Sequence, residues 1–332
     1  MTVDRGPALV TGAAGFVGRA VVAALRRHDV AVRAGVRSAS GAHGFPRCDG
    51  LDVVRIDLRD ARSLPAALEG VRSVYHFAAV MRGGGARDEL YAVNVEGTRT
   101  LWQCAADAGV ERALCCSSAS VYGLLAGSAH PIAESATPRA VEPYGRAKLE
   151  GEQVALEIGR ARGVVTVIIR PAAVLGPGER SAFGRAIRRA ALTRLLMPGR
   201  FPHHRFSFVH VADVAEAAVH VMSLPEPDGE IFNVAVETPI SFEEAFRVYL
   251  DVLRRSGGSL WRPALLARLS AYVQRRPALA RWLLDGGGRF RPAFPVGQLE
   301  RELVFTSRKL LATEFRYAWS DFGKVLASCV AA

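Results

Sequence analysis

Short apolar segments alternate with longer segments of helical periodicity along the first half of the chain. The apolar runs predict buried strands at 8–10, 30–36, 53–56, 73–77, 113–117 and 164–169. Between them, apolar residues at three- and four-residue spacing predict helices, for example over 64–68, 90–108 and 144–162. Strands that alternate with helices indicate an α/β fold, a doubly wound parallel sheet with helices on both faces.

Three glycines at three-residue spacing follow the first predicted strand. Gly12 allows a tight turn, Gly15 lets backbone N–H groups approach phosphates, and Gly18 lets the following helix pack close to the strand. The N-terminus of that helix adds partial positive charge. Because a strand and a helix flank the turn, the pattern favours a dinucleotide-binding Rossmann turn over an ordinary βα turn. The same turn supplies further expected contacts from Thr11, Ala14, Phe16 and Val17.

The pattern changes after Pro171, where Pro, Gly and Arg become frequent and the apolar segments become isolated. The clearest later strands are expected at 206–211 and 231–234. We expect residues 1–171 to form an NAD(P)-binding domain to which 206–236 return. Residues 172–205 and 237–332 are then expected to form a smaller C-terminal substrate-binding lobe.

Tyr144 and Lys148 stand four residues apart at the start of the predicted helix 144–162. Residues at this spacing share a helix face, so both side chains are expected to point into one cleft. A tyrosine with a pKa of about 10 is a poor base at neutral pH, but a neighbouring ammonium favours its phenolate. The pair therefore predicts a proton donor to a developing alkoxide, or an acceptor in the reverse direction.

A serine-rich segment ends the predicted strand 113–117, at the carboxyl edge of the sheet where ligands bind. A hydroxyl there can hydrogen-bond a substrate carbonyl and polarise it. Ser118 is the preferred candidate, with Ser117 and Ser120 as alternatives.

Together these motifs resemble the extended short-chain dehydrogenase/reductase superfamily. That group contains sugar-nucleotide epimerases, 3β-hydroxysteroid dehydrogenases and dihydroflavonol reductases. The matching segments are TGAAGFVG (11–18), DL (57–58), HFAA (76–79), NVEGT (94–98), SSASVYG (117–123), YGRAK (144–148), RP (170–171) and FVHVADVAEA (208–217). They cover most of residues 8–235 in the order that the family has.

The resemblance implies roles for single residues. Ser118, Tyr144 and Lys148 match the family's catalytic serine, tyrosine and lysine, and Lys148 would also hold the nicotinamide ribose. Asp57 and Leu58 match the adenine contact. The family pattern thus implies an NAD(P)-dependent oxidoreductase.

Other matches concern the frame of the cofactor site. Asn94 matches a position that shapes the central helix, and the backbone after Pro171 would meet the nicotinamide carboxamide. Asn94 and Pro171 are therefore implied cofactor contacts, as are Ala78, Ala79 and Val174.

The end of the second predicted strand bears on the form of the cofactor. NAD-specific proteins usually place an acid there for the ribose hydroxyls. Here no carboxylate follows the strand; Arg37 stands at its end, with Ser38 and Ser40 beside it. An arginine can grip a 2′-phosphate through paired N–H donors. We therefore expect NADP(H), with NAD(H) as the alternative.

The residues around the implied catalytic set narrow the reaction. Ala119 and Ser120 replace the acidic pair of sugar-nucleotide 4,6-dehydratases, and Ala173 replaces the asparagine of many epimerases. We expect a reductase that uses Tyr144 as proton donor to a ketone or aldehyde on an apolar small molecule. The first alternative is a sugar-nucleotide epimerase or reductase, whose diphosphate could bind Arg185, Arg188, Arg189 or Arg205. The second alternative is a non-catalytic nucleotide-binding regulatory protein.

The composition and charge limit the partners. The chain has 332 residues, of which 50% are hydrophobic and 23% charged, and a formal net charge of +11. The basic residues are scattered without a dense block, so no nucleic-acid partner is expected. The five cysteines do not have the spacing of metal ligands, so no bound metal is expected. The sequence shows no leader-like or membrane-spanning segment, and we therefore expect a cytoplasmic protein with reduced cysteines.

One basic amphipathic segment, 261–284, is the least family-like part of the chain. Such a helix can pack on its own domain, cover an apolar pocket or touch an anionic membrane weakly. A homodimer through the helices around 90–108 and 144–162 is a further expectation from the family.

Overall fold

The computed structural model describes residues 7–42, 44–46, 48–81, 87–123, 131–179, 204–255 and 302–330. At its centre lies a seven-stranded sheet in which every neighbouring pair of strands is parallel. The strands are, in spatial order, β3 (Leu51–Arg55), β2 (Val32–Val36), β1 (Ala8–Thr11), β4 (Ser73–His76), β5 (Arg112–Cys116), β6 (Val165–Pro171) and β10 (Ile231–Val234). The order reverses between β1 and β4, so a crevice opens beside the carboxyl end of β1.

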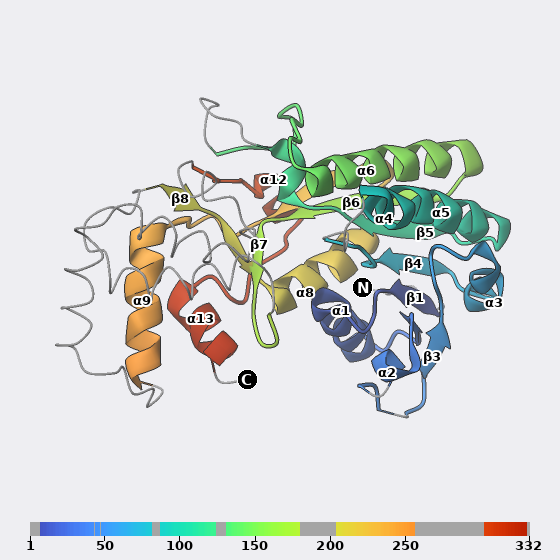
Figure 1. Ribbon diagram of the computed structural model, residues 1–332, viewed down its shortest axis with the longest axis horizontal. Coiled ribbons are helices and arrows are strands. Elements are labelled where there is room, and N and C mark those ends of the chain that lie inside the picture. Colours follow the sequence, from blue (N-terminus) through green and yellow to red (C-terminus); the bar gives the residue numbers. More distant parts are fainter. Residues whose placement is uncertain are drawn as a thin grey trace.

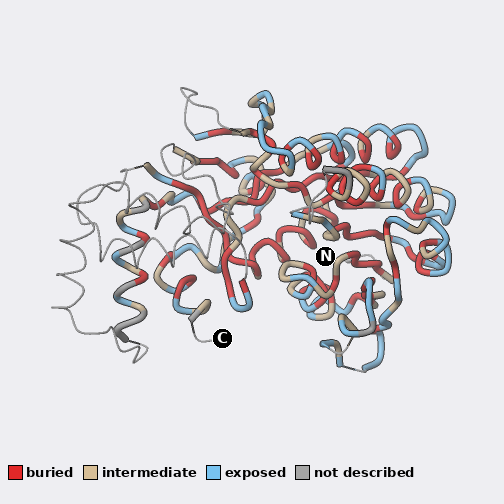
Figure 2. The backbone as a smooth tube through the Cα atoms, viewed as in Figure 1, coloured by how far each residue is buried: buried red, intermediate tan, exposed pale blue. Residues whose placement is uncertain are grey.

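Helices cover both faces of this sheet (Figure 1). On one face α1 (Phe16–Arg27) packs against α8 (Val211–Met222), with the short α2 (Ala39–Ala42) beside β2. The opposite face carries η1 (Ala61–Ser63), α3 (Pro65–Leu68), α4 (Arg87–Tyr91), α5 (Gly97–Asp107) and α6 (Pro143–Arg162). Each layer has a separate apolar core, and the strands between them are largely buried except for the edge strand β3 (Figure 2). The predicted doubly wound α/β fold is confirmed.

A smaller C-terminal lobe lies at one end of the sheet (Figure 1). It contains two two-stranded sheets, in which β7 (Ala173–Leu175) pairs with β9 (Phe208–His210) and β8 (Arg205–Phe206) pairs with β11 (Ile240–Ser241). The lobe also contains α9 (Phe242–Arg255) and α13 (Phe322–Val330), while α12 (Arg308–Leu311) contacts β10 of the central sheet. Phe206, Phe208 and Phe322 lie in the lobe's own apolar core.

Two predicted elements are interrupted in the structure. The segment 206–211 was expected to be one strand, but Ser207 separates β8 from β9 because its hydroxyl bonds the backbone of Phe305. The helix expected at 90–108 contains a π-helical turn, η2 (Ala92–Glu96), between α4 and α5. The side chain of Asn94 there bonds both the N–H and the carbonyl of Val80, at 2.8 and 2.7 Å.

The described residues contain no helix that is long and apolar enough to cross a bilayer. The basic segment 261–284 lies outside the described residues.

Candidate active site

The glycine turn is folded too tightly for side chains at two of its three glycines. Gly12 has a φ of +67°, and a Cβ on it would lie 2.6 Å from the backbone N of Ala78. A Cβ on Gly18 would lie 2.1 Å from the carbonyl oxygen of Gly12. Gly15 is exposed and precedes α1, which has no acidic residue in its first turn. The turn therefore combines close backbone packing with a helix N-terminus that suits an anion.

A pocket of about 310 Å³ opens over this turn at the carboxyl ends of the strands. Eight of the residues expected to contact a dinucleotide line it: Gly12, Ala14, Gly15, Arg37, Asp57, Leu58, Ala78 and Ala79. Six further lining residues were not predicted from the sequence: Gly35, Val36, Ile56, Phe77, Val80 and Val93. Except for Val93 of η2, the missed residues lie at or just beyond the ends of β2, β3 and β4, so their position at strand ends was the available signal.

Nine expected contacts do not line this pocket. Thr11 is fully buried beneath the turn and Asn94 is buried in η2; both belong to one hydrogen-bond chain through His76. Gly18 packs against Gly12, as described above. The other expected contacts outside this pocket lining are Phe16, Val17, Tyr144, Lys148, Pro171 and Val174.

Opposite charges meet at the rim of the pocket. Arg59 binds Asp57 through two hydrogen bonds, Nε–Oδ1 at 3.0 Å and Nη2–Oδ2 at 2.6 Å. This pairing lowers the pKa of Asp57 to about 2, and the nearby charge of Arg37 contributes. The carboxylate of Asp57 is thus engaged by Arg59, whereas Arg37 is exposed on the pocket wall.

Helix α6 carries Tyr144 and Lys148 close to its N-terminus. Tyr144 is half-buried, and Lys148 is only 4% exposed. Burial raises the pKa of Tyr144 above its ordinary value, although Lys148 acts in the opposite direction. The expectation that the ammonium would favour phenolate is therefore correct in sign, but desolvation outweighs it. Tyr144 keeps its proton at neutral pH and is suited to donate it.

The charge on Lys148 is retained in spite of its burial. Burial disfavours the ammonium, but the negative charge of Glu152, and those of Cys115, Tyr144 and Cys116 once these groups ionise at high pH, raise the pKa of Lys148 above its ordinary value. Burial also raises the pKa of Cys115 to about 11 and that of Cys116 to about 12. Both thiols therefore stay protonated beside a cationic lysine.

The three candidate serines differ in their surroundings. Ser118 precedes the short helix η3 (Ala119–Tyr122), and its Oγ accepts a hydrogen bond from the backbone N–H of Ser120 at 3.1 Å. The hydroxyls of Ser117 and Ser120 are buried and have no hydrogen-bond partner among the described residues. Ser118 is half-buried and lines a hollow beyond the end of β5. Among the three serines, Ser118 is the one whose hydroxyl has a hydrogen-bond partner within the described residues.

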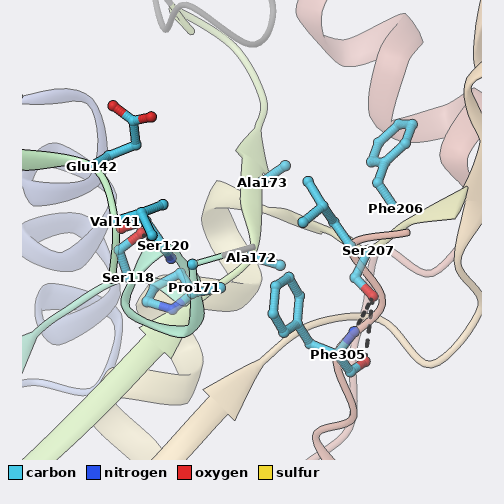
Figure 3. Close-up of a pocket in the computed structure, with 13 residues that line it drawn as sticks. Ser118, Ser120, Val141, Glu142, Pro171, Ala172, Ala173, Phe206, Ser207 and Phe305 are labelled. Carbon is cyan, nitrogen blue, oxygen red and sulfur yellow. Dashed lines mark hydrogen bonds between the residues drawn. The ribbon is translucent and has the colours of Figure 1, made fainter. Parts of the chain in front are cut away.

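This second hollow has a volume of about 180 Å³ and lies between the end of the central sheet and the C-terminal lobe (Figure 3). Ser118, Ser120, Val141 and Glu142 line one side, and Pro171 and Ala173 stand nearby (Figure 3). The far wall consists of residues that were not predicted from the sequence as part of a site: Phe206, Ser207, Leu303 and Phe305. No local motif marks these four residues, because tertiary packing brings them to the hollow.

Among the described residues, Arg205 is the one arginine of those expected to suit a diphosphate, and it does not line this hollow. Arg205 pairs with Glu302 through Nε–Oε1, at 3.0 Å. Arg185, Arg188 and Arg189 lie outside the described residues. The described residues also contain no cluster of side chains that could hold a metal ion.

Comparison with known proteins also points to a dinucleotide-binding fold. The model of the NAD dependent epimerase/dehydratase family matches residues 8–235. "Sterol demethylase protein B" of Methylococcus capsulatus is 40% identical over 227 residues, which are 65% of this chain and 65% of that protein. A "3 beta-hydroxysteroid dehydrogenase/Delta 5-->4-isomerase" of Mycobacterium tuberculosis is 30% identical over 316 residues, 90% of this chain and 80% of that protein.

The chain thus spans just under two thirds of the first relative and four fifths of the second. Among solved structures, the Bordetella bronchiseptica enzyme WbmG in complex with NAD superposes with a TM-score of 0.72 at 22% identity, over 99% of this chain and 94% of that one. At this identity the likeness concerns the fold.

Proposed function

Because the chain belongs to the NAD dependent epimerase/dehydratase family, within the extended short-chain dehydrogenases/reductases, and is an NAD(P)-dependent enzyme, we propose that it reduces a ketone or aldehyde on an apolar small molecule. The observation that carries this proposal is the lining of the hollow beside Ser118. Aromatic and aliphatic side chains dominate it, and Glu142 is its one ionisable residue among those that the structure describes. Such a lining suits a neutral apolar substrate.

The same lining argues against a sugar nucleotide. A diphosphate placed in the hollow would approach the carboxylate of Glu142, and Arg205 is already paired with Glu302. The relatives named for sterol demethylation and for 3β-hydroxysteroid dehydrogenation carry names that refer to apolar substrates. Both considerations support a reductase acting on a lipid-like carbonyl compound.

The proposed chemistry assigns one task to each catalytic side chain. The hydroxyl of Ser118 orients the substrate carbonyl by a hydrogen bond to its oxygen. Tyr144 gives its proton to that oxygen, which becomes the alcohol hydroxyl. Lys148 supplies positive charge that stabilises the phenolate left on Tyr144. A bound nicotinamide dinucleotide would supply the hydride to the carbonyl carbon.

The residues over the glycine turn fit such a dinucleotide. Gly15, which is exposed in the pocket lining and has no side chain, would let a phosphate approach the N-terminus of α1. We propose NADP(H) rather than NAD(H), because Arg37 lines the pocket and no carboxylate stands beside it at the end of β2. Ser38 and Ser40, whose hydroxyls lie 2.9 Å apart, would add neutral hydrogen-bonding groups near a 2′-phosphate.

Two experiments test the proposal, a cofactor titration and then a substrate panel. NADPH and NADH are titrated first, by the change in dihydronicotinamide fluorescence. The tighter cofactor is then used with a panel of steroid ketones, aryl aldehydes, and UDP- and dTDP-sugars. We expect NADPH to bind more tightly and a steroid or aryl carbonyl to be reduced. Turnover of a sugar nucleotide alone would contradict the substrate class, and binding without any turnover would favour the regulatory alternative.

A further inference from the structure

The hydroxyl of Tyr122 joins two parts of the molecule inside the protein. Tyr122 is fully buried at the end of η3, four residues after Ser118. Its hydroxyl donates a hydrogen bond to Oδ1 of Asn233 at 2.8 Å and accepts one from Nη1 of Arg170 at 3.0 Å. The hydroxyl thus acts both as a donor, to Asn233, and as an acceptor, from Arg170.

On one side the contacts lead to the catalytic helix. Arg170 donates two further hydrogen bonds to Glu152, Nε–Oε1 at 2.9 Å and Nη2–Oε2 at 2.6 Å. Glu152 lies on α6 four residues after Lys148, so the two side chains share one face of the helix. Arg170 and Glu152 are 3% and 2% exposed, respectively, so this ion pair is shielded from solvent screening.

On the other side the contacts lead to the wall of the substrate hollow. The side-chain nitrogen Nδ2 of Asn233 donates to the carbonyls of Ile132 and Thr306, at 3.2 and 3.1 Å. Thr306 belongs to residues 302–307, here called the strap, which contribute Leu303 and Phe305 to the hollow. The ring of Phe305 stacks on the ring of Tyr122 with centroids 5.6 Å apart.

We propose that Tyr122 is a positioning residue, whose hydroxyl holds the Ser118 loop and helix α6 in register with the strap. The proposal rests on the proposed function, because it requires Ser118 and α6 to carry the chemistry. This buried phenol, which follows the serine loop directly, is linked to α6 through Arg170 and to the strap through Asn233. Loss of its hydroxyl leaves Asn233 Oδ1 without its donor and removes an acceptor from Arg170, which loosens both connections.

The variant Tyr122→Phe isolates the role of the hydroxyl, since its ring can still stack on Phe305. We expect kcat to fall about tenfold or more for the carbonyl compound that the panel identifies, whereas KM changes less than about threefold. NADPH affinity should be unchanged, because Tyr122 does not line the cofactor pocket. The matched control is Tyr317→Phe, which removes a hydroxyl that accepts the Ala235 N–H at 2.9 Å and bonds Ser307 of the strap, but makes no bond to α6 or Arg170 among the described residues. Its kcat should stay within twofold of wild type.

Hydrogen exchange tests the same inference without turnover. Tyr122→Phe should speed amide exchange over 117–123 and 143–152, whereas Tyr317→Phe should leave these segments as in wild type. Unchanged exchange there, an unchanged kcat, or equal losses of kcat in both variants would overturn the inference. If wild type reduces no carbonyl compound, the proposed function fails while the exchange data still decide this one. If Tyr122→Phe does not fold, Glu152→Gln replaces it with the same expectations for kcat and for exchange over 143–152.

Discussion

The hydroxyl oxygen of Thr11 lies 2.7 Å from Nδ1 of His76, directly beneath the glycine turn. Thr11 Oγ1 also accepts the N–H of Ala78, so its proton is available to Nδ1. Nε2 of His76 lies 3.1 Å from the hydroxyl of Thr98, which in turn donates to the carbonyl of Asn94. All these groups are satisfied together when the imidazole is neutral and carries its proton on Nε2. The pocket floor is thus fixed by a buried neutral histidine.

This histidine should make stability depend on pH. Burial lowers its pKa from 6.5 to about 3. Below pH 6.5 the unfolded chain therefore binds a proton on His76, whereas the folded protein binds it only near pH 3. The free energy of unfolding should fall by about 1.4 kcal/mol for each pH unit well below pH 6.5 on account of this group.

Urea unfolding at pH 7 and pH 5 measures the effect in wild type, His76→Gln and the control His204→Gln. The loss on going to pH 5 should be about 2 kcal/mol smaller in His76→Gln than in wild type. The control should keep the wild-type slope. Identical slopes in all three proteins would show that His76 accepts a proton in the folded state.

Removal of the Tyr144 hydroxyl should abolish the proton donation that we propose. We expect Tyr144→Phe to lower kcat by about 10²–10⁴-fold, the usual contribution of a positioned general acid. NADPH binding, followed by fluorescence, should change little, because the ring remains. Wild-type turnover in this variant would exclude Tyr144 as the donor.

Arg37→Ala should weaken NADPH selectively. A hydrogen bond to a charged group contributes about 1.5–3 kcal/mol, so the Kd for NADPH should rise about tenfold to a hundredfold. The Kd for NADH, which lacks the 2′-phosphate, should change less than about twofold. Arg62→Ala, at an exposed arginine paired with Asp60, is the charge-matched control. Equal weakening of both cofactors by Arg37→Ala would contradict the role that we propose.

The carboxylate of Glu142 should disfavour anionic substrates. We expect Glu142→Lys to improve kcat/KM for a carboxylated ketone, relative to a neutral ketone of similar size, by about tenfold, since each exposed charge contributes up to about 1 kcal/mol. Glu150→Lys makes the same change of charge at an exposed position of α6 that does not line the hollow. A similar shift in both variants would indicate an effect of net charge alone.

The fold followed from local patterns because each strand and helix carries its own periodicity. Strands such as Ala8–Thr11 and Ser73–His76 lie within two residues of their predicted positions. The prediction was wrong for the single strand at 206–211, and the helix expected at 90–108 is present but contains a π-helical turn. In both cases a polar side chain, Ser207 or Asn94, bonds a backbone segment distant in sequence. No local pattern can contain such a bond.

The sequence by itself determined the glycine turn and the spacing of Tyr144 and Lys148, because backbone conformation and helix geometry act over a few residues. Tertiary structure alone decided that Phe305 and Leu303 wall the hollow, and that Tyr122 meets Arg170 and Asn233. It also decided that burial keeps Tyr144 protonated against the pull of Lys148. Desolvation and long-range contacts depend on the whole packed chain, and so they appear only when the chain is folded.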